Sequence, residues 1–338
     1  MRKTVFIIIF AFIVMNSAYS YDAPPYGENL LLLGFPGLMS DAASVSGGGI
    51  FDAGPYSVIL NPALTAPLQR VSANLGASIL LKDENTGFAF LMGALLPSRW
   101  GVWTALAQGA LLDLPFSPPG NMFNGRLGWS RDISENLYVG ASVFAGITSN
   151  YGTGYAAALD LGFVYRVGKL GFLKDARVSV AAANLGKTFG NDLYSNFPGS
   201  FALKGGFAAL LFENNNFSAG FSADAAFPTF QNMVLNLGVE LNIIKMITVS
   251  CGWDMNVHEF ANNKEMHGPS VGIGFKWTAN IGASGIMMNQ GWEQTDVNVS
   301  AVYQTINNSI NLFSAGVSAQ FGSIDRDPPV IKLGGAES

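Results

Sequence analysis

Histidine is the commonest metal ligand in proteins, and both histidines of this chain lie in one stretch. His258 and His267 share the segment HEFANNKEMH with Glu259 and Glu265. The spacing of these four groups matches no catalytic zinc pattern. We therefore expect exposed loop histidines, and the sequence predicts no metal site.

Two further patterns bear on catalysis. Gly152-Thr153-Gly154 resembles part of a dinucleotide-binding turn, but it opens a predicted strand and lacks the helix-terminal N–H groups that hold phosphate. Both histidines lie in one loop and no nucleophile elbow is visible, which argues against a Ser-His-Asp set. A barrel enzyme of phospholipase type would need a histidine on a strand, and neither is so placed. We predict no enzymatic activity and no cofactor.

The single cysteine, Cys251, excludes an intrachain disulfide and a thiolate metal site. It lies in the most regular stretch of the chain, residues 233–257. Apolar side chains alternate there with polar or small ones on both sides of a turn near Lys245, which is the period of a β-strand. Each run has about eleven residues, close to the roughly 9 to 11 that a tilted strand needs to cross a bilayer. The stretch predicts a hairpin in a barrel wall.

The composition agrees with a membrane protein. Of the 338 residues, 49% are hydrophobic and only 12% are charged, whereas a soluble domain usually has about 25% charged residues. No run after the first twenty residues reaches about 18 uninterrupted apolar residues, so helical spans are not expected. The net charge of −5 argues only against a strongly basic nucleic-acid binder, and we predict no nucleic-acid partner.

The N-terminal seventy residues divide into two parts. In residues 1–20, Arg2 and Lys3 precede an apolar run and Ala18-Tyr19-Ser20 offers a cleavage site, which predicts a signal peptide. Residues 21–70 are rich in glycine and proline, and we expect a plug, or hatch, folded into a barrel. The alternative is a disordered periplasmic leader. The plug is favoured by the apolar side chains Ile50, Phe51, Tyr56, Val58, Ile59 and Leu60.

Residues 71–321 predict an all-β fold, a transmembrane antiparallel β-barrel of about 14 strands. About fifteen candidate strands can be drawn, but bacterial single-chain barrels have even strand numbers, and the doubtful region is 269–289. Prolines such as Pro97 and Pro228 fall between runs. Long connections near 114–121, 186–198 and 258–268 alternate with short ones, which predicts extracellular loops and periplasmic turns. Residues 322–338 are expected to form a polar periplasmic tail.

The charged residues inside the predicted strands indicate which face meets lipid. All nine lie opposite the clearest apolar row of their strand, as expected if charges avoid lipid, where a basic side chain costs roughly 2 to 4 kcal/mol at midplane. They are Arg126, Asp160, Arg166, Arg177, Lys204, Asp224, Glu240, Asp254 and Lys276. A soluble β-sandwich would show the same alternation, but with far more lysine and glutamate than this chain has.

Several strands are apolar on both faces, for example FAFLMGALL at 88–96 and VWTALAQGALL at 102–112. A lumen lined by apolar side chains with few charges suits an apolar or amphipathic cargo with one polar end. Alternatively, these side chains pack against the plug. The predicted ligand-binding lumen residues are Leu91, Leu95, Trp103, Leu111, Phe144, Arg166, Glu240 and Lys276.

The exported leader, the small-residue segment from Ala53 to Ala63 and the barrel directly after it resemble the FadL-type outer-membrane proteins, in particular their PorV/PorQ-like and UPF0164 branch. The resemblance implies a bacterial outer-membrane protein in contact with lipid, with Asn61, Pro62 and Ala63 in a hatch. It implies passive transport of long-chain fatty acids or other hydrophobic small molecules, with a lateral opening in the wall. The PorV-like alternative implies a structural or protein-secretion barrel with a periplasmic or secreted protein partner.

Overall fold

The computed structural model describes residues 31–39, 43–47, 53–112, 121–149, 153–190, 201–230, 232–257, 260, 268–280, 294–306 and 310–322. The predicted signal peptide, both histidines and the tail after Gly322 lie outside these residues. So does the candidate strand at 280–289, apart from Asn280, which ends β12.

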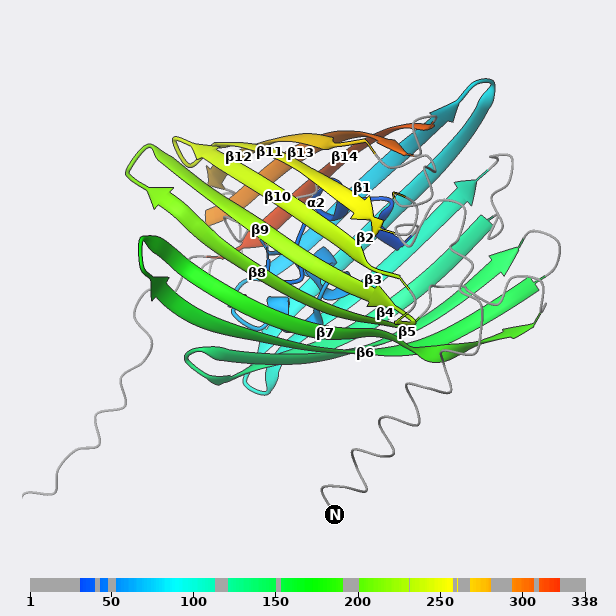
Figure 1. Ribbon diagram of the computed structural model, residues 1–338, viewed down its shortest axis with the longest axis horizontal. Helices are drawn as coiled ribbons and strands as arrows, with labels where there is room; N and C mark the ends of the chain where they lie inside the picture. Colours follow the sequence, from blue (N-terminus) through cyan, green and yellow to red (C-terminus); the bar gives the residue numbers. More distant parts are fainter. Residues whose placement is uncertain are drawn as a thin grey trace, which may run out of the picture.

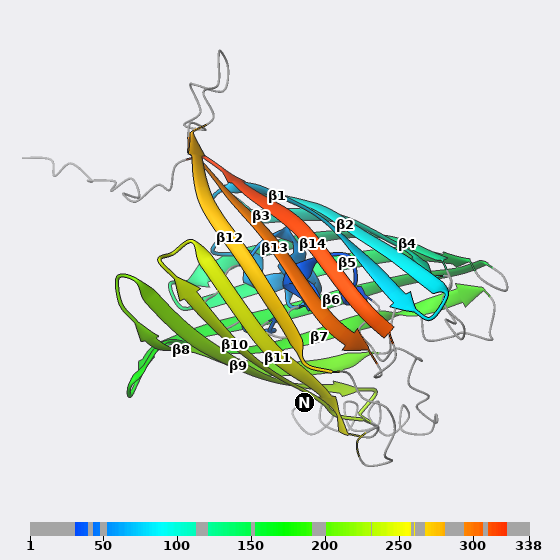
Figure 2. The same ribbon diagram turned by 90° about the horizontal axis from the view of Figure 1, so that it is seen from above.

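Within the described residues, fourteen antiparallel strands form a closed barrel in which β1 pairs with β14 and every other strand pairs with its chain neighbours (Figure 1). Seen from above, β14 lies beside β1 (Figure 2). The strands are β1 Val71–Lys82, β2 Asn85–Ser98, β3 Gly101–Leu112, β4 Asn121–Ser134, β5 Leu137–Ser149, β6 Thr153–Leu170, β7 Leu173–Gly190, β8 Ala202–Glu213, β9 Phe217–Pro228, β10 Val234–Ile243, β11 Ile247–Asn256, β12 Ser270–Asn280, β13 Gln294–Ile306 and β14 Ile310–Phe321. The predicted barrel of fourteen strands is confirmed, and the closed ring excludes the sandwich.

The predicted hairpin at 233–257 is formed by β10 and β11, which pair from Val234 with Asn256 to Ile243 with Ile247. Ile244 and Lys245 both have positive φ, 55° and 58°, and the Met246 N–H donates to the Ile243 carbonyl at 3.1 Å. Two successive left-handed residues form a turn whose twist matches that of the flanking strands. The turn therefore continues the ribbon into the barrel wall.

The two faces of the wall differ as the charges predicted. Arg126, Asp160, Arg177 and Asp254 are buried on the inward face. Bulky apolar side chains cover the outward face from strand to strand; among them are Leu75, Leu127, Val143, Phe163, Leu237, Val239, Ile273 and Phe275. An exposed apolar surface of this extent is not compatible with water and fits contact with lipid.

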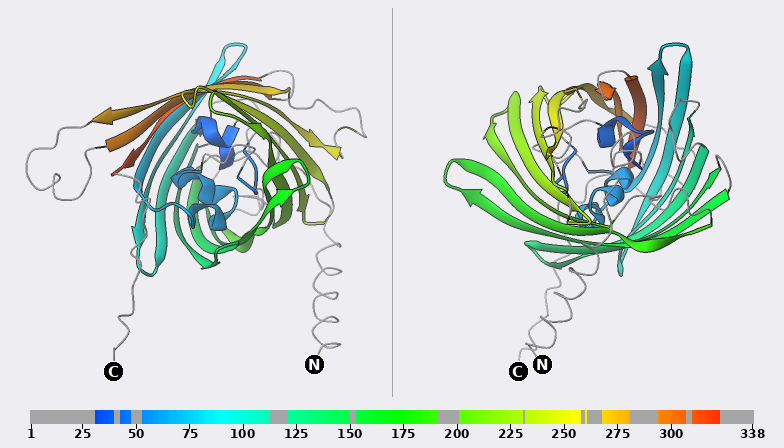
Figure 3. Two further views of the ribbon diagram at one scale, coloured as in Figure 1. Left: turned by 90° about the vertical axis from the view of Figure 1, so that its left-hand side faces the viewer. Right: turned by 45° about the vertical axis from the view of Figure 1, so that its right-hand side comes forward.

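The described residues before the barrel include α2, Pro36–Met39, and the 3₁₀ helices η2, Pro55–Ile59, and η3, Pro62–Thr65. Figure 3 shows them inside the ring of strands. We refer to the described residues from Leu31 to Arg70 as the inner segment. Its buried side chains pack on the inward faces of the strands, so the core of the molecule lies within the barrel.

Some predicted boundaries were wrong. β7 continues to Gly190, into the stretch predicted as the loop 186–198. Pro97 and Pro228 lie inside the ends of β2 and β9 and not between strands. A strand end tolerates proline because the ladder there can lack one N–H donor.

The connections at one end of the barrel are all short where the structure describes them. They join β2 to β3, β4 to β5, β6 to β7, β8 to β9 and β10 to β11, at 99–100, 135–136, 171–172, 214–216 and 244–246. β1 begins and β14 finishes at this end, because the strands alternate in direction. We call it the short-turn end.

Candidate functional site in the lumen

Three of the predicted apolar lumen residues face inward. Leu91 and Leu95 on β2 have an exposed fraction of 0%, and Phe144 on β5 has 3%. Leu91 packs with Phe35 and Val58 of the inner segment. Leu91 and Phe144 therefore pack in clusters that include residues of the inner segment, as the packing alternative expected.

The inward orientation predicted for Trp103 and Leu111 on β3 is wrong. Their side chains are 53% and 56% exposed and point away from the lumen. The opposite row of β3 is buried and includes Thr104, Leu106 and Gln108. Both rows of this strand are rich in apolar residues, so hydrophobicity could not separate them. The polar residues Thr104 and Gln108 mark the inward row, in the same way as charged residues do on other strands.

The predicted polar lumen residues lie apart from one another. Arg166 sits near the short-turn end of β6, where its guanidinium pairs with Asp175 at 2.9 Å and donates to the Tyr138 hydroxyl at 3.3 Å. Glu240 on β10 lines a cavity described below. Lys276 is partly buried on β12, one residue beyond the stretch that pairs with β11. They do not form one binding site.

The Asn61-Pro62-Ala63 motif forms the start of η3. The Asn61 side chain accepts a hydrogen bond from the Ala63 N–H at 3.0 Å and so caps the helix, while Pro62 occupies the first helical position. The Asn61 amide also donates to the Val45 carbonyl at 2.9 Å and to the Phe163 carbonyl of β6 at 3.3 Å. One asparagine thus shapes the inner segment and ties it to the wall.

Two apolar layers fill much of the lumen. The layer nearer the short-turn end packs η2 and η3 against β2, β3, β5 and β6 through Val58, Leu60, Leu64, Leu91, Leu106, Tyr138 and Val164, among others. The second layer, toward the opposite end, packs Leu31, Leu33 and Met39 against strand residues that include Leu80, Leu112, Phe144, Ile306 and Leu312. The inner segment contributes residues to both layers. Together the layers fill the lumen beside β1 to β6, β13 and β14.

Polar contacts hold the inner segment at further points. The Gln108 amide donates to the carbonyl oxygens of Leu31 at 2.9 Å and Leu33 at 2.6 Å. The hydroxyls of Ser46 and Ser179 lie 2.7 Å apart. Such contacts satisfy backbone groups that a buried irregular segment would otherwise leave unpaired.

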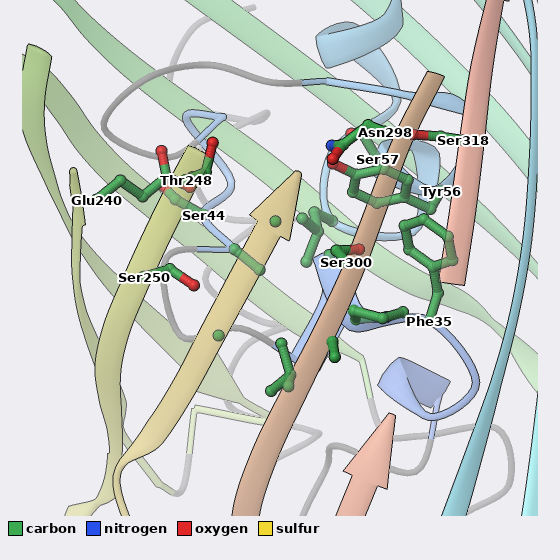
Figure 4. Close-up of a pocket in the computed structure, with 18 of the residues that line it drawn as sticks. Phe35, Ser44, Tyr56, Ser57, Glu240, Thr248, Ser250, Asn298, Ser300 and Ser318 are labelled. Atoms are coloured by element: carbon green, nitrogen blue, oxygen red, sulfur yellow. The ribbon is translucent and has the colours of Figure 1, made fainter. Parts of the chain in front are cut away.

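A cavity of about 90 Å³ lies between the inner segment and the wall formed by β10 to β14. Phe35 and Tyr56, whose ring centroids are 4.6 Å apart, form its inner-segment side together with leucines. The wall side contains Ile273, Ala301 and Val302 together with polar side chains, and Figure 4 shows the polar ones on neighbouring strands. These are Glu240, Thr248, Ser250, Asn298, Ser300 and Ser318.

The wall leaves room for this cavity because its inward residues are small. Gly272 and Gly274 of β12 contribute no side chain, and Ser250 and Ser300 fill little space on the adjacent strands. The cavity therefore has an aromatic face and a face of hydroxyl, amide and carboxylate groups. Such a site suits a small amphipathic molecule.

Within the described residues, no group of three or more histidine, cysteine, aspartate or glutamate side chains is placed to bind a metal. No helix in that part of the chain has the length and hydrophobicity needed to span a membrane.

No protein-family model and no curated protein matches the sequence. Solved structures do resemble the fold. The CymD monoaromatic hydrocarbon channel is 13% identical over 86% of this chain and 99% of its own, with a TM-score of 0.52. The Ralstonia pickettii toluene transporter TbuX is 14% identical over 87% of this chain and 99% of its own, with a TM-score of 0.51. A Pseudomonas aeruginosa FadL homologue is 10% identical over 86% of this chain and 98% of its own, with a TM-score of 0.48. The first two likenesses show that this chain shares the fold of the CymD channel and the TbuX transporter.

Proposed function

We propose that this protein is a passive channel for hydrophobic small molecules in the bacterial outer membrane. The amphipathic cavity between the inner segment and the β10–β14 wall is the observation that carries the proposal. Its aromatic side offers contact to an apolar molecule, and its polar side offers hydrogen bonds to one polar end. The fold that this chain shares with the CymD monoaromatic hydrocarbon channel and the toluene transporter TbuX supports it.

The size of the cavity bears on the cargo. At about 90 Å³ it is smaller than the roughly 150 Å³ apolar cavity that takes up benzene in an engineered protein. A small ring compound therefore needs only a local movement, whereas a long-chain fatty acid requires a larger displacement of the inner segment. We propose the smaller cargo first, and keep long-chain fatty acids within the proposed substrate class.

The inner segment would act as the plug of this channel. It contacts both apolar layers, and its polar ties to Gln108, Asp224 and Phe163 hold it in the closed arrangement. Residues 1–20 would direct export, and residues 322–338 would remain in the periplasm as a tail. Cargo would leave through the periplasmic end or a lateral opening in the wall.

Uptake into liposomes tests the transport proposal. Purified protein should raise the rate at which toluene or a fluorescent fatty acid enters vesicles, compared with empty vesicles and with the unrelated polar solute glucose. An uptake rate equal to that of empty vesicles for both hydrophobic probes would count against transport. A general increase that includes glucose would indicate an unselective pore.

A structural or protein-secretion barrel of PorV-like type is the second candidate. It is favoured by the complete burial of Leu91 and Leu95, two side chains that an open transport lumen would expose to cargo. Under this proposal a periplasmic or secreted protein would bind the barrel stably and be pulled down with it. Deletion of residues 322–338 would abolish the pull-down of this partner. Isolation of the tagged protein from native membranes as a lone barrel would argue against it.

A further inference from the structure

Three tryptophans gather on the outward face of the wall, next to the short-turn end. Trp103 of β3 and Trp129 of β4 are direct cross-strand partners. The Trp129 indole N–H donates to the carbonyl oxygen of Trp100, in the turn between β2 and β3, at 3.1 Å. Trp100 itself is 62% exposed. The three indoles thus form one outward patch.

Two arginines border this patch. The Arg99 guanidinium lies over the Trp100 ring, 5.0 Å from its centroid. Arg131 is exposed and follows Trp129 by two residues, so both lie on the same face of β4. Neither arginine forms an ion pair within the residues that the structure describes. The neighbouring Asp132 pairs with Tyr138, which is buried in the lumen, and so belongs to the other face of the sheet.

An apolar track leads away from the patch along the outward wall. Leu96 of β2 is the cross-strand partner of Trp103, and Leu127 of β4 precedes Trp129 by two residues. Both leucines are more than half exposed. The surface therefore has cationic groups and indole rings at its edge and aliphatic side chains toward the middle of the wall.

We propose that Arg99, Trp100, Trp103, Trp129 and Arg131 form a binding site for an anionic phospholipid. The two guanidinium groups would bind the phosphate, the indoles would lie at the level of the headgroup and glycerol, and the acyl chains would follow Leu96 and Leu127. The inference rests on the proposed membrane location, and not on transport. It assigns Trp103, which the sequence pattern placed in the lumen, to a lipid contact.

The arginines should give the site a preference for anionic over zwitterionic lipid of about fivefold for each guanidinium near the membrane surface. Brominated lipids, which quench tryptophan fluorescence on contact, can measure it. The protein would carry Trp253→Phe, Trp277→Phe and Trp292→Phe, so that only the three indoles of the patch report. Vesicles would contain a small fraction of brominated phosphatidylglycerol or, in parallel, brominated phosphatidylethanolamine.

We expect brominated phosphatidylglycerol to reach half-maximal quenching of the tryptophan fluorescence at a mole fraction at least about fivefold lower than brominated phosphatidylethanolamine. Arg99→Gln with Arg131→Gln should remove this preference, and Arg99→Lys with Arg131→Lys should restore part of it. The matched control, Lys169→Gln with Lys245→Gln, removes two charges from the same end of the barrel and should leave the preference unchanged. A gel-mobility shift on heating checks that each variant folds.

Equal quenching by the two lipids in the protein that keeps both Arg99 and Arg131 would overturn the proposed site. So would an equal loss of preference in the control, because the effect would then reflect general surface charge. Removal of the preference by millimolar inorganic phosphate would indicate a free-anion site and reject the lipid. Toluene uptake measured in the same vesicles separates the two proposals, because lipid preference without uptake counts against transport alone. A protein that does not enter the vesicles contradicts the shared membrane location.

Discussion

Asp224 on β9 accepts a hydrogen bond from the backbone N–H of Val45 at 2.8 Å, across 179 residues of sequence. Its other carboxylate oxygen accepts from the Ser44 hydroxyl, also at 2.8 Å. Because Ser44 lines the cavity, this carboxylate holds one border of the proposed cargo site in place. It also links the inner segment to the side of the wall that the apolar layers do not reach.

Asp224→Ala should loosen the inner segment without unfolding the barrel. A hydrogen bond typically contributes about 0.5 to 1.5 kcal/mol, whereas the strand ladders of β9 do not involve this side chain. Limited proteolysis in detergent should cut near residues 40–50 several-fold faster, while the heat-induced gel shift stays unchanged. Asp224→Asn keeps one acceptor oxygen, so its cutting rate should lie between those of the unchanged protein and Asp224→Ala. Equal cutting rates in all three proteins would contradict the proposed tie.

The buried pair of Arg126 and Asp160 should be far more sensitive to single than to double replacement. The Ser142 hydroxyl accepts from Arg126 at 3.0 Å and donates to Asp160 at 2.9 Å, and both charged side chains are only 4% exposed. Removing one partner leaves an uncompensated buried charge, which typically costs 3 to 5 kcal/mol. Urea unfolding should therefore show a large loss for Arg126→Leu or Asp160→Leu, and a smaller one for the double variant. Additive losses would contradict the coupling.

Asp160 has a second role that complicates its replacement. Its other oxygen accepts from the Asn184 N–H at 2.7 Å, where β7 has an extra residue relative to β6 and Asn184 has φ of 58°. A bulge of this kind leaves one backbone group outside the ladder, and the carboxylate satisfies it. Asp160→Leu should consequently cost more than Arg126→Leu in the same urea series.

The sequence predicted the barrel well because most strands have one polar and one apolar row. In β10, Asn236 and Glu240 lie on one face of the strand, and Leu237 and Val239 lie on the other. The structure has the predicted pairing of β10 with β11. β3 lacks this contrast, since leucine and alanine occupy both rows, and Trp103 was assigned to the wrong face. The less conspicuous Thr104 and Gln108 were the better guide, because a polar side chain avoids lipid even when it carries no charge.

The candidate site could not be predicted in the same way. The contacts of Asp224 with Ser44 and of Gln108 with Leu31 join residues 180 and 77 positions apart. No local pattern encodes such partners, and a lone aspartate in a strand reads only as an inward charge. The cavity likewise combines small residues of several strands with Phe35 and Tyr56, so it appears only once the inner segment is placed.

Gly140→Val should displace η3. A Cβ atom at Gly140 on β5 would lie 2.6 Å from the Ala63 nitrogen and 2.6 Å from the Pro62 carbonyl oxygen, both backbone atoms that must then move. Overpacking of this kind usually costs 1 to 3 kcal/mol. Planar-bilayer recordings should show more frequent openings than in the unchanged protein. Gly125→Val on β4 is the matched control, since its nearest neighbour is 3.8 Å away, and openings as frequent as those of Gly140→Val would refute the steric explanation.

Gly274→Leu should narrow the cavity and slow uptake if cargo passes through it. A Cβ atom there would have its nearest neighbours, Asn298 and Thr248, at 3.4 and 3.6 Å, so a side chain can start without moving the backbone. Gly274 faces inward, and the added isobutyl group would occupy space beside the polar wall. Toluene uptake into liposomes should fall several-fold at equal amounts of folded protein. Val271→Leu, on the outward face of the same strand and outside the cavity, should leave uptake unchanged. If Gly274→Leu transports toluene as fast as this control, the cavity is not on the path of the cargo, because a route through about 90 Å³ cannot tolerate a new leucine.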